Sequence, residues 1–341
     1  MKKNGEMFEQ AIKELSDDLI TPPGFFSDVD IRNVLDKDIV ICNYNEENLT
    51  DIGYNLTATE FIFSINNGLL VEIQHNENEQ FCFIEPHDTV LVITRESVWV
   101  SDKISGTFHS KVKMVSSGFG HVSTTLDPFW EGPLVISINN PTNKLLKFPI
   151  KLDKKDGRGF NHCSFVTLIF YKMVTPAKKV HDNSSCRLDI LKTIIEKPKE
   201  DDKEYYEYDA LDNVINNIAE LDFVKHNIKE LRDPLKRGDG IKAFKQKGNE
   251  FDIKIKDYIQ EAKSITEKIR KQKQLKQTTN NKFKKWLNIL YVLPILYILY
   301  IAIKNRSSES VNLGQILPLF LSVYLAFFVQ DIKNLYSKKE N

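Results

Sequence analysis

The chain has 341 residues, and its 47 Lys and Arg residues balance 47 Asp and Glu residues, so the formal net charge is zero. This length suits two ordinary domains or one domain with appendages. A hydrophobic content of 41% with 28% charged residues excludes a wholly disordered chain and a polytopic membrane protein. Zero net charge also argues against a surface coated with cations for binding duplex nucleic acid.

Residues 1–22 have the pattern of a short amphipathic helix, without the apolar segment that directs secretion. The cysteines are far apart and form no C-x-x-C pair: Cys42, Cys82, Cys163 and Cys186. We therefore expect reduced thiols and a domain that faces the cytoplasm.

Residues 23–180 are predicted to form a β domain. The segments 90–100, 132–140 and 164–173 are rich in β-branched and aromatic residues and are bounded by turn residues. No helical pattern separates them, which favours a sandwich or barrel over alternating strands and helices. Ser27 ahead of the sequence DVDIRNVL predicts a short capped helix before the main strands.

Residues 210–285 have a helical pattern, after a charged linker predicted at residues 181–209. One apolar stripe comprises Leu211, Val214, Ile218, Leu221, Ile228 and Leu231, and Pro234, Gly238 and Gly240 are predicted to end it. A second set recurs at spacings of three and four as a coiled-coil-like seam: Phe251, Ile255, Tyr258, Ala262, Ile265 and Ile269. Two helices packed within one chain and a coiled coil between chains both fit, and either would form a helical stalk.

Two uncharged apolar segments, residues 286–303 and 313–329, are predicted to be transmembrane helices joined as a hairpin. A buried hairpin in a soluble domain is the alternative, but both segments are apolar on every face. Lysine and arginine residues gather before the first segment and after the second. The positive-inside rule therefore predicts an inner or plasma membrane protein whose N-terminal domain and C-terminus face the cytoplasm.

Several segments of the β domain resemble the dCTP deaminase/dUTPase family, in that family's order. They are SDVDIRNVLDKDIVICNY from Ser27, DIGYNLTA at 51–58, FIEPHDTVLVITRE at 83–96 and STTLDPFWEGPLVISINNP at 123–141; FVTLIFYKM resembles the closing strand. The resemblance implies a distorted jelly roll that assembles as a homotrimer, with nucleotide sites at subunit interfaces. It does not extend to the stalk or to the membrane hairpin.

The resemblance also implies a nucleotide site around residues 109–127. Lys111 takes the position of the family's first phosphate-binding Arg, Val112 and Lys113 those of its two serines, and Ser116 that of its second Arg. The candidate nucleotide-binding residues are Lys111, Lys113, Ser116, His121, Thr124, Thr125 and Asp127. A solvated face for the two lysines, a surface or packed position for His121, and a turn-forming role for Asp127 with Pro128 remain alternatives.

The positions that would carry catalysis are altered. The general-base Glu of the deaminases falls at Ser137, and a serine hydroxyl does not ionise near neutral pH. Asn55 stands where the family has an Asp. Mg²⁺ is expected only on a bound nucleotide triphosphate, and no zinc is expected because no C-x-x-C pair follows the H-N-E sequence at 75–77.

Three functions therefore fit the sequence. The first is a membrane-anchored enzyme that deaminates dCTP to dUTP or hydrolyses dUTP. The second is a catalytically inactive module that senses a pyrimidine deoxynucleotide and signals to the membrane hairpin, an architecture similar to bacterial anti-phage effectors. The third is a trimeric scaffold. The expected partners are two further copies of the chain, a nucleotide and the lipid bilayer, and not duplex nucleic acid.

Overall fold

The computed structural model describes residues 22–120, 123–153, 160–178, 190–191, 195, 205–221, 229–233 and 235–304. The chain divides into two compact units, Met1–Ile269 and Arg270–Asn341. Of the second unit only residues 270–304 are described, and all of them belong to the helix α7 (Arg237–Lys304).

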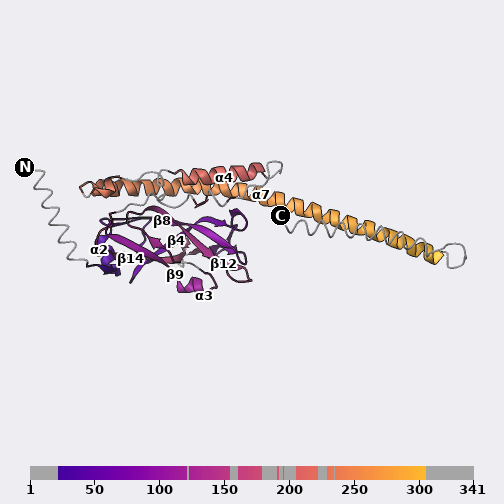
Figure 1. Ribbon diagram of the computed structural model, residues 1–341, viewed down its shortest axis with the longest axis horizontal. Helices are drawn as coiled ribbons and strands as arrows, with labels where there is room; N and C mark the ends of the chain where they lie inside the picture. The colour runs from indigo at the N-terminus through magenta and orange to yellow at the C-terminus, as the bar shows by residue number, and fades with distance from the viewer. Residues whose placement is uncertain are drawn as a thin grey trace, which may run out of the picture. The chain divides into compact units, whose positions relative to one another are not determined.

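The N-terminal domain is mainly β and consists of two antiparallel sheets (Figure 1). The central path of the larger sheet runs in the order β10-β9-β14-β4-β8-β11, and the smaller sheet has the order β13-β12-β7-β6. The path strands are β10 (Thr125–Leu126), β9 (Ile104–Ser110), β14 (Ser164–Lys172), β4 (Gly53–Ser64), β8 (Thr89–Val100) and β11 (Glu131–Asn139). Four short strands also join this sheet: β1 (Gly24–Phe25), β2 (Ile39–Cys42), β3 (Leu49–Thr50) and β5 (Leu69–Leu70). The smaller sheet consists of β13 (Phe160–His162), β12 (Leu146–Asp153), β7 (Glu79–Ile84) and β6 (Ile73–His75).

The strands predicted at residues 90–100, 132–140 and 164–173 are confirmed as β8, β11 and β14, each within a residue of the predicted ends. The short capped helix is also confirmed. It is α2 (Asp28–Val34), and Ser27 and Asp30 form a capping box in which each side chain bonds the other's backbone N–H. Another short helix, η1 (Glu46–Asn48), precedes β3.

Side chains of both sheets form one hydrophobic core, in which Tyr54, Val92 and Phe148 are fully buried. A second cluster lies on the other face of the larger sheet, where Val40, Phe63 and Trp99 point outward from β2, β4 and β8. Such a face would expose a large apolar area to water unless another layer covered it.

Helices provide that cover. Helix α4 (Tyr205–Ala219) and the first part of α7 lie side by side along this face, and α3 (Val112–Ser116) lies on the opposite side of the β domain (Figure 1). The seam residues Phe251, Ile255, Ala262 and Ile269 are buried in the same cluster as Trp99. As far as Ile269, the apolar stripe therefore packs within its own chain, against the sheet and the other helices.

Polar contacts hold the helical layer in place. Lys245 of α7 binds Asp36 at 2.6 Å, Arg237 binds Asp38 at 3.3 Å, and Lys263 binds Glu60. Gly238 and Gly240 do not end a helix but lie in the first turn of α7. A Cβ on Gly240 would come within 2.6 Å of the Leu231 backbone nitrogen, so this glycine allows α7 to approach α6 (Lys229–Arg232) closely.

Two other expectations concern the predicted linker and the cysteines. Leu191, inside the predicted linker, is buried against the helical layer, and α4 begins at Tyr205 within the same range. The cysteines among the described residues, Cys42, Cys82 and Cys163, are free thiols.

The first predicted membrane segment, residues 286–303, falls within α7. A helix is predicted at residues 1–22, of which residues 1–21 lie outside the described residues, as does the second membrane segment, residues 313–329. Among the helices that are described, none combines the length and apolar character needed to span a bilayer.

Candidate functional site

The predicted nucleotide segment forms the end of β9, the helix α3 and the strand β10. Lys111 is the residue before α3, and its ammonium donates a hydrogen bond of 2.6 Å to the Ser164 hydroxyl on the adjacent strand β14. Partial burial lowers the pKa of Lys111, and the positive charge of nearby Lys113 lowers it further. Lys113 and Ser116 are exposed on α3, so this short helix presents polar side chains to solvent.

Thr124, Thr125 and Asp127 follow one another beside β9. The Thr124 carbonyl accepts a hydrogen bond from the Phe108 N–H, and the Thr125 hydroxyl donates to Asp127 at 3.3 Å. Leu126 pairs with Gly106, five residues before Lys111 along β9. At the rise of a β-strand this separates Asp127 from Lys111 by on the order of 15 Å. One chain therefore does not bring these two candidates together, and His121 lies outside the described residues.

Asp127 also shapes a turn. Its carbonyl accepts a hydrogen bond from the Trp130 N–H, and Phe129 between them adopts a positive φ of 63°. Trp130 packs against both hydrophobic clusters. The alternative that Asp127 forms a turn is therefore supported directly. The Asp127 side chain is half-buried.

Ser137 and Asn55, the positions that the resemblance predicts to be altered in catalysis, have different surroundings. Ser137 lies on β11 opposite Leu91, and its side chain is exposed. Asn55 on β4 is buried, and its side-chain oxygen accepts a hydrogen bond of 2.8 Å from Thr167 on β14. Neither side chain has a carboxylate that could act as a general base.

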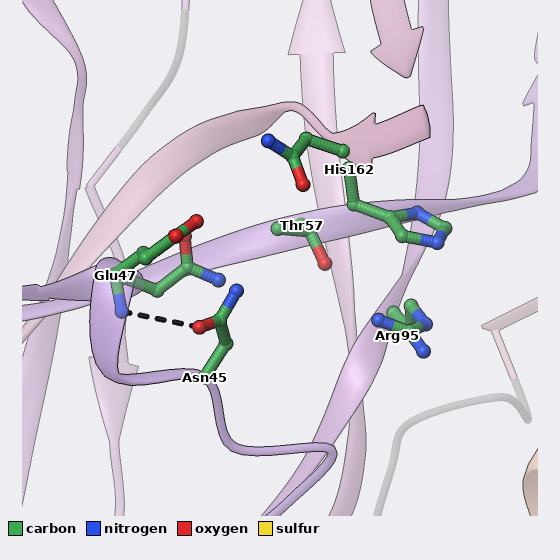
Figure 2. A pocket seen from close by; sticks show the side chains of 7 residues that line it. Asn45, Glu47, Thr57, Arg95 and His162 are labelled. Carbon is green, nitrogen blue, oxygen red and sulfur yellow. Dashed lines mark hydrogen bonds between the residues drawn. The ribbon is translucent and has the colours of Figure 1, made fainter. Parts of the chain in front are cut away.

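A polar cavity that the sequence did not predict lies between β4, β8, β13 and the turn before β3. Its volume is about 420 Å³, within the range of small-molecule sites. Figure 2 shows Arg95 and His162 on one side, Asn45 and Glu47 on the other, and Thr57 between them; Asn48 and Asn161 complete the lining.

Two ionisable groups with shifted pKa values lie at this cavity: His162 lines it, and the buried Glu96 contacts the lining residue Thr57. The Glu96 carboxylate accepts hydrogen bonds from the Thr57 N–H and hydroxyl at 2.8 and 2.7 Å. Burial raises the pKa of Glu96 to about 7 despite these bonds. Burial also lowers the pKa of His162 to about 4, and the nearby cations Arg95 and Lys151 act in the same direction, so His162 is neutral at pH 7.

No sequence motif marks this cavity, because its lining residues come from separate segments of the chain. The one signal in the sequence was the adjacent charged pair Arg95 and Glu96 in the otherwise apolar strand VLVITRESVWV. A charged pair inside a buried strand needs buried partners. No cluster of His, Cys, Asp and Glu that could hold a metal occurs among the described residues.

The dCTP deaminase-like family model matches residues 25–150. A dCTP deaminase of Pyrococcus abyssi is 24% identical over 144 residues, which cover 42% of this chain and 82% of that protein.

Solved structures match a similar share of this chain at lower sequence identity. The dCTP deaminase of Agrobacterium tumefaciens matches with a TM-score of 0.32 and 11% identity over 44% of this chain, and the match spans only 48% of that chain. A dUTPase of the Staphylococcus bacteriophage 80alpha, a mutant with dUpNHpp, matches with a TM-score of 0.28 and 16% identity over 43% of this chain and 92% of its own. Residues 25–150 are thus similar in sequence to dCTP deaminase-like domains.

Proposed function

We propose that the β domain binds a pyrimidine deoxynucleotide such as dCTP or dUTP and does not deaminate it by the route of its family. The observation that carries this proposal is Ser137. Its hydroxyl is exposed on β11 where the resemblance places the general base, and a serine hydroxyl cannot remove a proton from water at neutral pH without an activating base. Asn55 adds a second neutral side chain in place of an acid.

The binding chemistry rests on Lys111 and Lys113. The Ser164 hydroxyl fixes the Lys111 ammonium, and Lys113 lies close enough for its charge to lower the pKa of Lys111. Two neighbouring ammonium groups attract a phosphate chain as point charges, without the bidentate geometry of arginine. Mg²⁺ would arrive as part of the triphosphate ligand and neutralise some of its charge.

A homotrimer would complete the site. Because Asp127 and Lys111 do not meet within one chain, a nucleotide that contacts both needs residues from two subunits. We place the trimer contacts in the β domain, since the seam from Phe251 to Ile269 is buried within the chain. The segments 286–303 and 313–329 would anchor the assembly in a membrane as a hairpin, with the β domain and the C-terminus on the cytoplasmic side.

A sensing role is the form of this function that the fold favours. The helical layer packs directly on β2, β4 and β8, and α7 continues without a break from this layer to Lys304. A change in the β domain on nucleotide binding would therefore act on the same helix that contains the first predicted membrane segment. This arrangement suits a module that reports nucleotide binding to a membrane effector, as in anti-phage defence.

The test uses the full chain, purified in detergent and incubated with each deoxynucleoside triphosphate and Mg²⁺. We expect a rise in melting temperature with dCTP or dUTP and no release of ammonia, pyrophosphate or dUMP. Lys111→Met should weaken binding about tenfold, as expected for the loss of one charged contact. The control Lys254→Met removes an exposed lysine of α7 and should bind normally.

Each alternative function has its own outcome. Turnover of dCTP or dUTP by the wild-type chain would contradict a non-catalytic site and support the enzymatic function instead. Absence of binding by every nucleotide would leave only the trimeric scaffold. Monomers alone, after cross-linking in membranes and in detergent, would contradict the trimer and with it the shared site.

A further inference from the structure

The cavity beside Arg95 is a site separate from the proposed nucleotide segment. It is lined by residues of the turn at 45–48, by Thr57 of β4, Arg95 of β8, and Asn161 and His162 of β13. None of the candidate residues from Lys111 to Asp127 lines it. Because its lining includes no large apolar side chain, its occupant is a polar molecule.

Arg95 is the cation of this cavity. Its side chain is half-buried, and no ion pair or hydrogen bond joins its guanidinium to another residue in the described part of the chain. The carboxylate of the adjacent Glu96 is not paired with Arg95, because it accepts hydrogen bonds from Thr57. A guanidinium has five donors in a planar fork that matches a carboxylate in a bidentate contact.

Neutral donors surround this cation. The side-chain oxygen of Asn45 accepts a hydrogen bond from the Glu47 N–H at 3.1 Å, which turns its NH₂ group toward the cavity (Figure 2). His162 also lines the cavity, although its Nδ1 atom is buried.

The charge of the lining selects the class of ligand. Arg95 supplies one positive charge, His162 is neutral because burial lowers its pKa to about 4, and the Glu47 carboxylate lies on the opposite side. A dianionic phosphate monoester would leave one negative charge without compensation beside Glu47. A single carboxylate on Arg95, with an amino or hydroxyl group toward Glu47, satisfies both sides.

We propose that this cavity binds a small organic carboxylate, held through its carboxylate by Arg95 and Asn45 and through a hydrogen-bond donor by Glu47. Thr57 contributes an acceptor, since its hydroxyl proton is directed to Glu96. Glutamine has the required carboxylate, ammonium and amide groups, and is the first probe.

The experiment measures saturation-transfer NMR signals of glutamine, lactate and acetate on the full chain. Inorganic phosphate has no carbon-bound protons, so its binding is measured by competition against the glutamine signal. We expect saturable binding of the carboxylates, with glutamine the tightest, and weaker or no binding of phosphate. Arg95→Gln should weaken glutamine binding at least tenfold, as for the loss of a charge-assisted pair. The control Lys254→Gln removes an exposed cation of α7 that does not line the cavity and should leave binding unchanged.

Asn45→Asp provides a second variant in case Arg95→Gln does not fold. It keeps the oxygen that accepts from the Glu47 N–H, but replaces the amide donor with a negative charge that repels a carboxylate. We expect it to fold normally and to lose glutamine binding. Equal binding by wild type and both variants, preference for phosphate, or the absence of any saturable signal would each overturn the proposal. Loss of glutamine binding in Lys111→Met would also do so, because it would assign the ligand to the nucleotide segment.

Discussion

Asn140 shows how one side chain can determine a local structure. It is fully buried, and its amide NH₂ donates to the carbonyls of Ile84, Glu85 and Lys144 at 2.7–2.9 Å. Its side-chain oxygen accepts from the Thr142 N–H and hydroxyl. Through these bonds one residue joins the end of β11 to the loops on both sides.

Asn140→Asp should therefore be strongly destabilising. The variant replaces the NH₂ group by a carboxylate oxygen that faces carbonyl oxygens in a buried site, at a cost of roughly 3 kcal/mol. Asn139→Asp is the matched control, because Asn139 is exposed on the same strand. Urea unfolding of both variants measures the difference, and equal stability would contradict the role assigned to Asn140.

Glu96 should make the protein less stable as the pH rises. Burial raises its pKa from 4.5 to about 7, so between these values the folded chain holds a proton that the unfolded chain has released. The free energy of unfolding then falls by up to about 1.4 kcal/mol per pH unit. Glu96→Gln removes this titration, and its free energy of unfolding should change less between about pH 5 and about pH 7 than that of the wild type. Parallel pH curves for the two proteins would show that Glu96 does not titrate in this range.

At the scale of elements, the main feature is the docking of α7 on the outer face of the larger sheet. Ile255 is buried in the cluster that contains Trp99, whereas Ile253 on the same helix is 64% exposed. Both isoleucines lie between charged residues in the sequence DIKIK at 252–256. The spacing of three and four identified the buried stripe, but a seam of this kind does not say whether its partner is a helix or a sheet.

Ile255→Ala should cost about 2–4 kcal/mol, because it leaves a cavity between α7 and the sheet. Ile253→Ala should change stability by less than about 0.5 kcal/mol. A second measurement is the reaction of the Cys42 thiol, which is buried and lies 3.9 Å from the Phe244 carbonyl of α7. Thiol labelling of Cys42 should be faster in Ile255→Ala only, and equal labelling rates would contradict the docked position of α7.

At the scale of the whole molecule, Glu60 connects the two sheets and the helical layer. It lies on β4 and contacts Lys151 of β12 at 3.0 Å, Gln80 of β7 at 2.7 Å and Lys263 of α7. Burial by itself would raise the pKa of Glu60, but the hydrogen bonds from these partners outweigh it and lower the pKa to about 2.

The stabilisation by Glu60 is therefore complete above about pH 4.5 and is lost as the pH falls toward 2. Glu60→Gln should lower stability by roughly 1–2 kcal/mol at neutral pH, since the pairs are partly buried. This difference should shrink on acidification. Glu261→Gln changes an exposed carboxylate of α7 and serves as control. A pH-independent difference would mean that packing, and not the ion pairs, accounts for the effect.

The sequence by itself determined the three predicted β strands, the cap of α2 and the similarity of the β domain to dCTP deaminases. These features depend on neighbouring residues, through alternation, capping and turn chemistry. Only the tertiary structure decided that the seam of α7 packs on its own sheet, that Lys111 and Asp127 stay apart in one chain, and that Arg95 faces a polar cavity. Each of these depends on which distant segments meet, and local patterns of polarity do not encode that choice.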